Sequence, residues 1–379
     1  MRRAGAEPQP MIRFAFTIAL MIAAGCGGPS GDRPPVSLPL NAFQAGPNLY
    51  VASSGGRGQN PPPPGGVSVY GLLRGRLLQK ISQGVDHPTA VALGPNGDLF
   101  VANQEPLNSQ EGGSVTVYDP GRGVPARTLQ QTRNPDALAF DALGNVYVAN
   151  KWGAGYGGSC QIGNVGVYAP GGNYPMRVIG DAYNAVNLPS ALAFDGAGDL
   201  YVSNGPTAVG SSGCGDTITV FRPGESAPSL TITNGVFYPR ALALAPGVLY
   251  VANGPPHGVI HLPKGSVTEY SLTSGSLLKT ITNGINAPYS LAIDSSGNLY
   301  VANVNGHNVA VYAAGGSVPT RVITKGATSP RALSFSNGGD LYVANVYQNT
   351  VSVYDPGSDT PRLTIHVPYK DPASIVIGR

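Results

Sequence analysis

The chain has 379 residues, of which 42% are hydrophobic and only 11% are charged, and its formal net charge is +3. So few charges, with no basic stripe, argue against a nucleic-acid-binding surface, and we expect no nucleic-acid partner. The 53 glycines and 35 prolines are interpreted as the tight turns of a repeated unit rather than as disorder.

Residues 1–25 are expected to be an export signal. Arg13 precedes the apolar run Phe14–Ala24, which is too short to span a bilayer as a helix, and Ala-Ala-Gly then precedes Cys26. Small residues before a cysteine resemble a bacterial lipoprotein signal, and this resemblance implies lipidation of Cys26. The alternative is simple secretion with cleavage near Gly25. Translation could start at Met1 or at Met11.

Residues 26–40 are rich in proline and glycine and are expected to be a tether between the anchor and the folded domain. Gly27 stands where lipoproteins retained in the inner membrane commonly have aspartate. The resemblance therefore favours a location in the cell envelope, at the outer membrane, with a lipid anchor at Cys26 as the contact with the membrane. Without lipidation, the protein would be secreted.

Residues 41–379 repeat one unit, whose clearest copy is PYSLAIDSSGNLYVAN at 288–303. Its Leu-Tyr-Val-like triplets begin at positions 49, 99, 146, 200, 249, 299 and 341, so successive copies are 42 to 54 residues apart. Each copy contains an apolar run, a turn with Asp and Gly, and a second apolar run, which together predict a hairpin. A second pair of short runs follows, so each unit has four strands, and no segment of the mature chain has helical periodicity.

Four-stranded units with this period predict an all-β fold, a closed seven-bladed β-propeller of antiparallel blades. The pattern Pro-x-x-Leu-Ala-x-Asp-x-x-Gly-Asn-Leu-Tyr-Val-Ala-Asn resembles the NHL-repeat family and its relatives with YVTN-type signatures. The resemblance implies the fold but says little about function, since such propellers include binding modules, scaffolds, lactonases and lyases.

The end of the chain, Pro372–Gly378 (PASIVIG), repeats only the first strand of a unit. We therefore expect it to close the ring by forming the inner strand of the blade that begins at Leu49–Ala52. The competing assignment uses Asn41–Gln44 for this strand. The β-branched character of the C-terminal segment favours the former.

Cys160 and Cys214 occupy equivalent loops of adjacent units, each ten residues after the asparagine that ends its motif. In an oxidising compartment such a pair is expected to form a disulfide. Two free surface thiols are the alternative, since the sequence does not give the distance between them.

Most of the repeated polar residues are expected to be structural. The motif asparagines could form a polar ring, but a hydrogen bond from each side chain to the backbone of its loop is preferred. They are Asn103, Asn150, Asn204, Asn253, Asn303 and Asn345. The repeated aspartates of the turns, such as Asp141, Asp195 and Asp294, are interpreted in the same way.

The loops between the second and third strands, together with the connections between units, should lie on one face of the ring, here called the loop face. The loops of the first five units have 11 to 14 residues and the last two have 5. Long loops in a regular repeat are typical places for function. Several aromatic rings fall in or beside these segments, namely Trp152, Tyr156, Tyr238 and Tyr289. They suit a peptide or glycan surface, although they could simply pack their own loops.

Two functions remain open. The preferred hypothesis is a non-catalytic module of the cell envelope that binds or scaffolds a peptide, glycan or protein partner through the loop face, with no cofactor, no metal and no catalytic residue. The alternative is a metal-assisted hydrolase or lyase, gluconolactonase-like or virginiamycin-lyase-like. It would use His257, His261 and His307, whose imidazoles lie on loops without a spacing that fixes a metal site. In either case these histidines are candidate ligand-binding residues.

Overall fold

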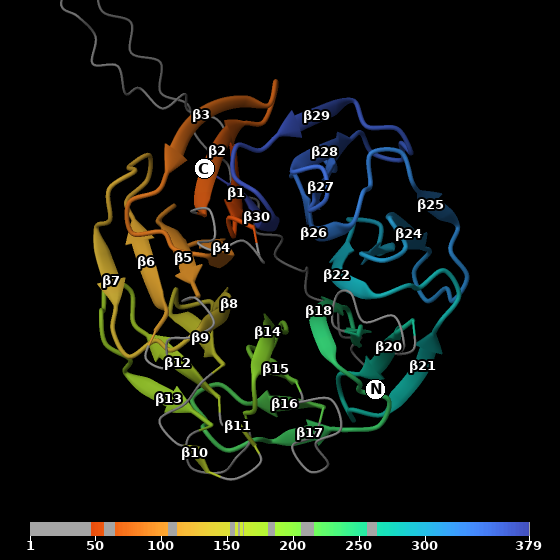
Figure 1. Cartoon of the computed structure of the whole chain (residues 1–379). Helices are drawn as coiled ribbons and strands as arrows, with labels where there is room; N and C mark the ends of the chain where they lie inside the picture. Colours follow the sequence, from red (N-terminus) through yellow and green to blue (C-terminus); the bar gives the residue numbers. More distant parts are fainter. Residues whose placement is uncertain are drawn as a thin grey trace, which may run out of the picture. The chain divides into compact units, whose positions relative to one another are not determined.

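A computed structural model describes residues 47–56, 65–104, 112–151, 156–157, 160–161, 163–180, 186–205, 216–255 and 264–378. Within these ranges every regular element is a β-strand, and seven sheets contain four antiparallel strands each. Figure 1 shows these sheets arranged as a ring around a central axis. The predicted seven-bladed β-propeller is therefore confirmed.

The strands of each blade follow in order from the axis outwards. Blade one contains β30 (Pro372–Gly378), β1 (Asn48–Ser53), β2 (Gly66–Gly71) and β3 (Arg76–Ile81). Blade two contains β4 (Pro88–Leu93), β5 (Leu99–Asn103), β6 (Ser114–Tyr118) and β7 (Arg127–Leu129). Blade three contains β8 (Pro135–Phe140), β9 (Val146–Asn150), β12 (Asn164–Tyr168) and β13 (Arg177–Ile179). A two-stranded hairpin, β10 (Tyr156–Gly157) and β11 (Cys160–Gln161), is inserted in the third blade.

The remaining blades have the same order. Blade four contains β14 (Pro189–Phe194), β15 (Leu200–Asn204), β16 (Thr217–Phe221) and β17 (Leu230–Ile232). Blade five contains β18 (Pro239–Ala245), β19 (Val248–Asn253), β20 (Ser266–Ser271) and β21 (Leu277–Ile281). Blade six contains β22 (Pro288–Ile293), β23 (Leu299–Asn303), β24 (Asn308–Tyr312) and β25 (Arg321–Ile323). Blade seven contains β26 (Pro330–Phe335), β27 (Leu341–Asn345), β28 (Thr350–Tyr354) and β29 (Leu363–His366).

The hydrophobic core lies between neighbouring blades, because both faces of each sheet carry apolar residues. Tyr300 and Val311 of blade six, for example, pack in one buried cluster with Leu341 and Val343 of blade seven. The inner strands of neighbouring blades also contact one another all the way around the ring, including β30 with β4 and with β26. Each blade is therefore buried by its neighbours, which explains why a short repeat can form a stable domain.

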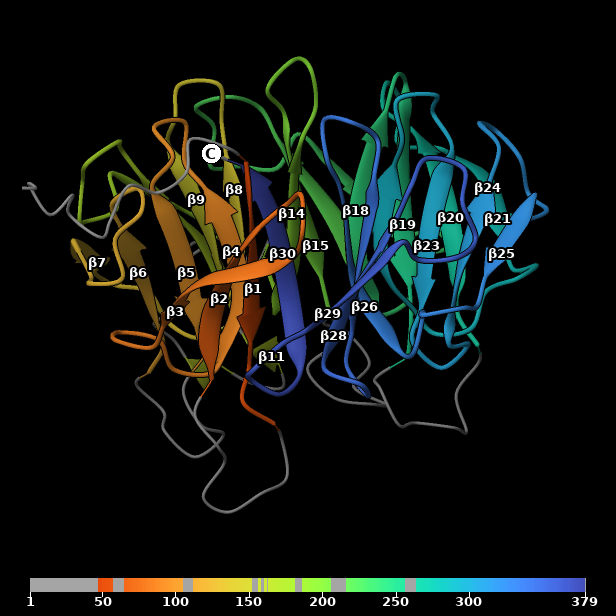
Figure 2. The ribbon, with the colours of Figure 1, turned by 90° about the horizontal axis from the view of Figure 1, so that it is seen from above.

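The ring is closed by the last strand, as predicted. In blade one, β30 pairs with β1 in antiparallel register, with Leu49 opposite Ile377 and Val51 opposite Ile375. Figure 2 shows these two strands side by side. Because β30 occupies the inner position, the competing assignment of Asn41–Gln44 to this strand is wrong.

The repeated aspartates stabilise the turns between the inner and second strands. The carboxylate of Asp294 accepts hydrogen bonds at 2.9 Å from the backbone N–H groups of Ser296 and Asn298, and at 2.8 Å from the Asn298 side chain. Asp141 and Asp195 accept equivalent backbone bonds. Their structural role is confirmed.

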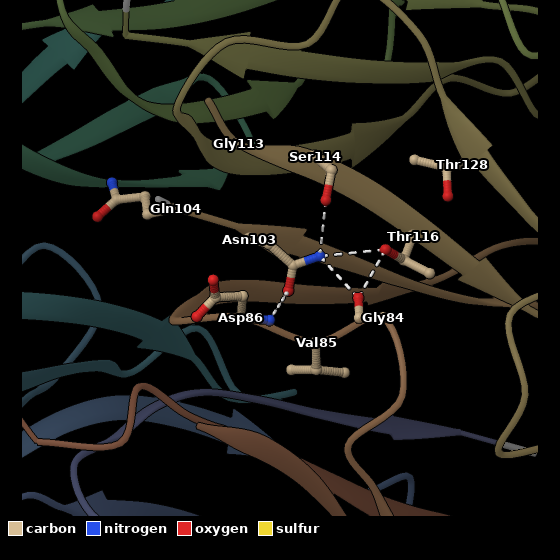
Figure 3. A pocket seen from close by; sticks show the side chains of 9 residues that line it. All are labelled: Gly84, Val85, Asp86, Asn103, Gln104, Gly113, Ser114, Thr116 and Thr128. Atoms are coloured by element: carbon tan, nitrogen blue, oxygen red, sulfur yellow. Dashed lines mark hydrogen bonds between the residues drawn. The ribbon is translucent and has the colours of Figure 1, made fainter. Parts of the chain in front are cut away.

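The motif asparagines are buried connectors, and the prediction that they bond to backbone is confirmed. Asn103 accepts the N–H of Asp86 at 3.0 Å and donates to the Gly84 carbonyl and to the hydroxyls of Ser114 and Thr116 (Figure 3). The backbone that they bind belongs to the connection entering the blade. Each motif asparagine thus ties a blade to the segment that leads into it.

The loop face is defined by strand pairing. Pro288 at the start of β22 lies opposite Asn303 at the end of β23, and Asn303 lies opposite Asn308 at the start of β24. The starts of inner strands and the connections between second and third strands therefore share one face. In the described part of the chain, no helix is long and apolar enough to cross a membrane.

Candidate functional site

A β-bulge near the start of every inner strand places one side chain of each blade around the axis. The ladder skips the residue that follows the proline, as between Pro288 and Ser290 of β22. Such bulges redirect a side chain out of the regular alternation of the sheet. The bulged residues are Thr89, Asp136, Ser190, Arg240, Tyr289, Arg331 and Ala373.

The residue before each of these prolines has a left-handed backbone, with φ between 41° and 57°. These residues are His87, Asn134, Leu188, Tyr238, Ala287, Ser329 and Asp371. The carbonyl of each accepts a backbone N–H from the residue after the second strand of the same blade, as Ala287 does from Val304 at 3.1 Å. This bond fixes the conformation that a residue before proline would otherwise avoid. The entry to each inner strand is thereby held in one position.

Three bulged residues of neighbouring blades form a stack at the axis. The Arg331 guanidinium lies 4.9 Å from the centre of the Tyr289 ring and donates from Nη2 to the Tyr289 hydroxyl at 3.0 Å. The Arg240 guanidinium lies 5.8 Å from the same ring. Both are cation–π contacts. Tyr289 therefore lies between two positive charges.

A second polar group lies on blade three. The Asp136 carboxylate accepts from Lys151 Nζ at 2.8 Å and from Gln104 Nε2 of blade two at 3.0 Å. Blade three lies across the ring from blade six, but its charges still affect the Tyr289 phenol. Asp136 raises the pKa of Tyr289 and Lys151 lowers it. These six residues, Gln104, Asp136, Lys151, Arg240, Tyr289 and Arg331, are called the axial cluster below.

The axial cluster changes the acidity of its own members. Burial opposes ionisation of the Tyr289 phenol, but the adjacent guanidinium groups of Arg331 and Arg240 outweigh it and hold the pKa of Tyr289 below its usual range. Burial also favours loss of the Arg331 proton, but the Tyr289 oxygen and more distant carboxylates outweigh it and raise the pKa of Arg331. Perturbed groups that converge on one opening are typical of functional sites.

Neither guanidinium of this stack has a carboxylate partner among the described residues. Arg331 Nε is buried and has no hydrogen-bond acceptor in the part of the chain that the structure describes. Among the described residues, the one hydrogen bond of the Arg240 side chain is long, 3.4 Å from Nε to the Gly254 carbonyl. The Asp216 carboxylate interacts electrostatically with Arg240 without an ion pair, and burial raises the pKa of this carboxyl. The Tyr289 side of the axial cluster is therefore positively charged.

Of the residues selected from the sequence, Tyr289 lies in the axial cluster and Tyr238 beside it. Tyr238 immediately precedes β18, and its ring makes an edge-on contact with Phe237 at 4.7 Å between centroids. His307 lies in the tight turn between β23 and β24, where its Nδ1 accepts the backbone N–H of Ser329 at 3.1 Å. Its ring lies 5.5 Å from that of Tyr347. The structure thus gives His307 a backbone partner rather than a place in the cluster.

The predictions for the other selected residues are not tested by the structure. Trp152, His257, His261, Cys26 and Cys214 lie outside the described residues, as do the side chains of Tyr156 and Cys160. In the rest of the chain, no group of three or more histidine, cysteine or acidic side chains is placed to hold a metal ion.

Sequence reasoning missed the two arginines of the axial cluster. The signal for them exists in the repeat itself: when the seven copies are aligned on their prolines, the next position reads Thr, Asp, Ser, Arg, Tyr, Arg and Ala. The proline before it, and the Ala or Ser and the aliphatic residue after it, remain nearly constant. A column that varies within a constant repeat indicates side chains that the fold does not need.

A hollow on the loop face, separate from the axial cluster, has a volume of about 330 Å³ and lies between Gly84–Asp86 and the third strand of blade two. Figure 3 shows that the Asn103 side chain already binds Gly84, the Asp86 N–H, Ser114 and Thr116, and the Gln104 side chain donates to Asp136 outside the hollow. The amide groups of the hollow are therefore already engaged. The axial cluster is therefore the better candidate site.

No protein-family model matches the chain, and no curated protein matches its sequence. Many solved structures share the fold at low sequence identity. One is a Bacteroides fragilis protein provisionally described as a 6-phosphogluconolactonase, with 16% identity and a TM-score of 0.65 over 89% of this chain and 99% of that one. Another is Kuenenia stuttgartiensis hydrazine synthase, with 17% identity and a TM-score of 0.63 over 77% of this chain and 90% of that one. A computationally designed protein, Ika8, has 15% identity and a TM-score of 0.58 over 87% and 93% of the two chains. At these identities the similarity concerns the fold alone, and the chain is a seven-bladed β-propeller.

Proposed function

We propose that this propeller is a non-catalytic binding module that takes a peptide, glycan or protein partner on its loop face, with the axial cluster at the centre of the contact. The observation that carries the proposal is the Tyr289 ring held between two guanidinium groups that lack ion-pair partners within the described ranges. Arginine and tyrosine are the side chains that most often dominate binding energy at interfaces. Their position on rigid inner strands suits recognition, since little ordering is needed on binding.

The alternative, a metal-assisted hydrolase or lyase, has less support. Of its three histidines, His307 alone lies in the described part, where its Nδ1 is occupied by the backbone of Ser329. The provisional lactonase among the structural neighbours shares the fold at 16% identity, which does not transfer an activity. Elemental analysis of the purified protein tests this alternative directly: a stoichiometric metal lost in a His307→Ala variant would favour it.

We further propose that the module is exported to the cell envelope, in line with the resemblance of its repeat to NHL-type and YVTN-type propellers. Support comes from residues 1–25, from Cys26 and from the equivalent positions of Cys160 and Cys214 in the repeat. A Cys26→Ser variant should lose membrane attachment and appear in the soluble fraction. Titration of native, unreduced protein should find no reactive thiol at Cys160 or Cys214, and two free thiols would refute the disulfide.

Binding is tested with a panel of soluble glycans, short peptides and small polar metabolites, using ligand-observed NMR. Ligands of the axial site should bind the wild type and lose binding in Tyr289→Ala. The matched control is Tyr174→Ala, which removes a ring that is 66% exposed in the turn between β12 and β13, on the opposite face. If no compound distinguishes the two variants, the assignment of the site to the axial cluster is wrong.

A further inference from the structure

Two hydrogen-bond donors of the Arg240–Tyr289–Arg331 stack have no acceptor among the described residues. The Tyr289 oxygen accepts from Arg331 Nη2, and no acceptor for the proton of its own hydroxyl is present among the described residues. Arg331 Nε is buried and also lacks an acceptor there. Buried donors without partners cost free energy, so a group that accepts from them would be stabilised at this position.

The same stack has unpaired charge. Both guanidinium groups lie within 6 Å of the Tyr289 ring centre, at 4.9 and 5.8 Å. The two cations therefore repel each other across the ring. Asp136, the acid of the axial cluster, is already engaged by Lys151 at 2.8 Å and by Gln104 at 3.0 Å. A ligand with negative charge would relieve this repulsion, whereas a cationic ligand would increase it.

The missing partner must accept several hydrogen bonds and carry negative charge. Carboxylate and phosphate groups meet both conditions, and the planar guanidinium fork matches the spacing of their oxygen atoms. A neutral hydroxyl would accept a bond but leave the charges uncompensated. The chemistry of the stack thus favours an oxyanion over a neutral sugar or an amine.

We infer that Arg240, Tyr289 and Arg331 form an oxyanion site that receives a carboxylate or phosphate group of the ligand. This inference rests on the proposed function and specifies the chemical class that the loop face recognises. Arg331 would approach from one side of the Tyr289 ring plane and Arg240 would supply the second cation, while the phenol donates its free proton to the same anion. The Asp136 carboxylate, held by Lys151 and Gln104 on blade three, would repel a second anionic group on that side of the ring.

The inference is tested by isothermal titration calorimetry of the full mature chain at low ionic strength, with inorganic phosphate and citrate as anionic probes and glycerol as the neutral probe. Saturable binding of either anion is expected, and added salt should weaken it. Arg331→Gln and Arg240→Gln should each weaken binding roughly tenfold or more, because each removes a charge-assisted hydrogen bond. Tyr289→Phe keeps the ring, removes one donor and should have a smaller effect.

The matched control is Arg122→Gln, which makes the same change of charge at an exposed residue in the turn after β6, on the opposite face. Circular dichroism must show that the folded content of each variant is unchanged.

Preference for phosphate over citrate would identify a phosphorylated ligand, and the reverse would identify a carboxylate. Absence of saturable anion binding, or equal losses in Arg122→Gln and Arg331→Gln, would overturn the inference. The two proposals can fail separately. If no anion binds but a neutral compound of the NMR panel binds the wild type and not Tyr289→Ala, the proposed binding function stands and the oxyanion site is wrong.

Discussion

Val51, in the first described strand, lies directly opposite Ile375, in the last strand of the chain, within one antiparallel ladder. Both are buried, at 0% and 8% exposure, in a cluster that also contains Tyr342 and Ala344 of blade seven. The two ends of the domain therefore share one sheet and one core. Loss of this contact would open the ring between its first and last blades.

Deletion of residues 372–379 should cause a large loss of thermal stability, because β1 would lose its inner partner and blade seven its neighbour. A finer test is Ile375→Ala, expected to cost about 2–4 kcal/mol of unfolding free energy through lost burial and a residual cavity. The control Leu73→Ala truncates a side chain that is 92% exposed and should change stability by less than about 0.5 kcal/mol. Equal effects in chemical denaturation would contradict this account of ring closure.

The sequence predicted the blades and their closure because both depend on strong local patterns. Apolar alternation, Asp-Gly turns and the incomplete unit at Pro372–Gly378 are visible in one copy of the repeat after another. Hydrogen bonds of the buried asparagines could be predicted for the same reason: a short amide beside a loop has few other uses.

The centre of the loop face could not be predicted in this way. Its geometry depends on a bulge after each proline and on a left-handed residue before it, as at Ala287 and Tyr289 of blade six. Backbone preferences alone favour an extended residue before proline. Which bulged residues approach each other depends on ring closure, so the contact of Arg331 with Tyr289 exists only in the assembled fold.

Asn345 offers a test of the motif asparagines. Its side chain is fully buried, accepts the Thr328 N–H at 2.9 Å and donates to the Gly326 carbonyl at 2.9 Å. Asn345→Ala should destabilise the fold by about 2–3 kcal/mol, because buried backbone groups would lose their partners. The control is Asn337→Ala, in an exposed turn of the same blade. Urea denaturation with similar midpoints for the two variants would refute the connector role.

Buried tyrosines of the third strands should make the fold sensitive to alkali. The Tyr312 hydroxyl donates to the Asn283 carbonyl at 2.6 Å, and burial raises the pKa of Tyr312 to about 12. Since an unfolded tyrosine has a pKa of about 10, the unfolded chain loses this proton first. The stabilising contribution is therefore complete below pH ~10 and is lost as the pH rises towards ~12.

Unfolding free energy measured across this pH range should fall less steeply in Tyr312→Phe than in the wild type. The difference between the two slopes should correspond to about one proton, because unfolding of Tyr312→Phe releases about one proton fewer in this pH range. The control Tyr174→Phe removes the hydroxyl of an exposed ring. An unchanged slope in Tyr312→Phe would mean that this phenol is not protected by the fold.

Tyr289 should ionise at lower pH than the buried tyrosines, because its pKa is lowered rather than raised. In a near-ultraviolet absorbance titration of the native protein, the earliest tyrosine step, at a pH below the usual tyrosine pKa of about 10, is expected to belong to Tyr289. Tyr289→Phe should remove this early step, and Tyr238→Phe, at the neighbouring ring, should leave it in place. In Arg331→Met the step should move to higher pH, since burial still opposes ionisation while one of the two cations that favour it is gone. Added phosphate should move the wild-type step in the same direction, because a bound anion repels the phenolate. An early step that persists in Tyr289→Phe would mean that the two guanidinium groups do not act on this phenol, and the electrostatic basis of the proposed site would be lost.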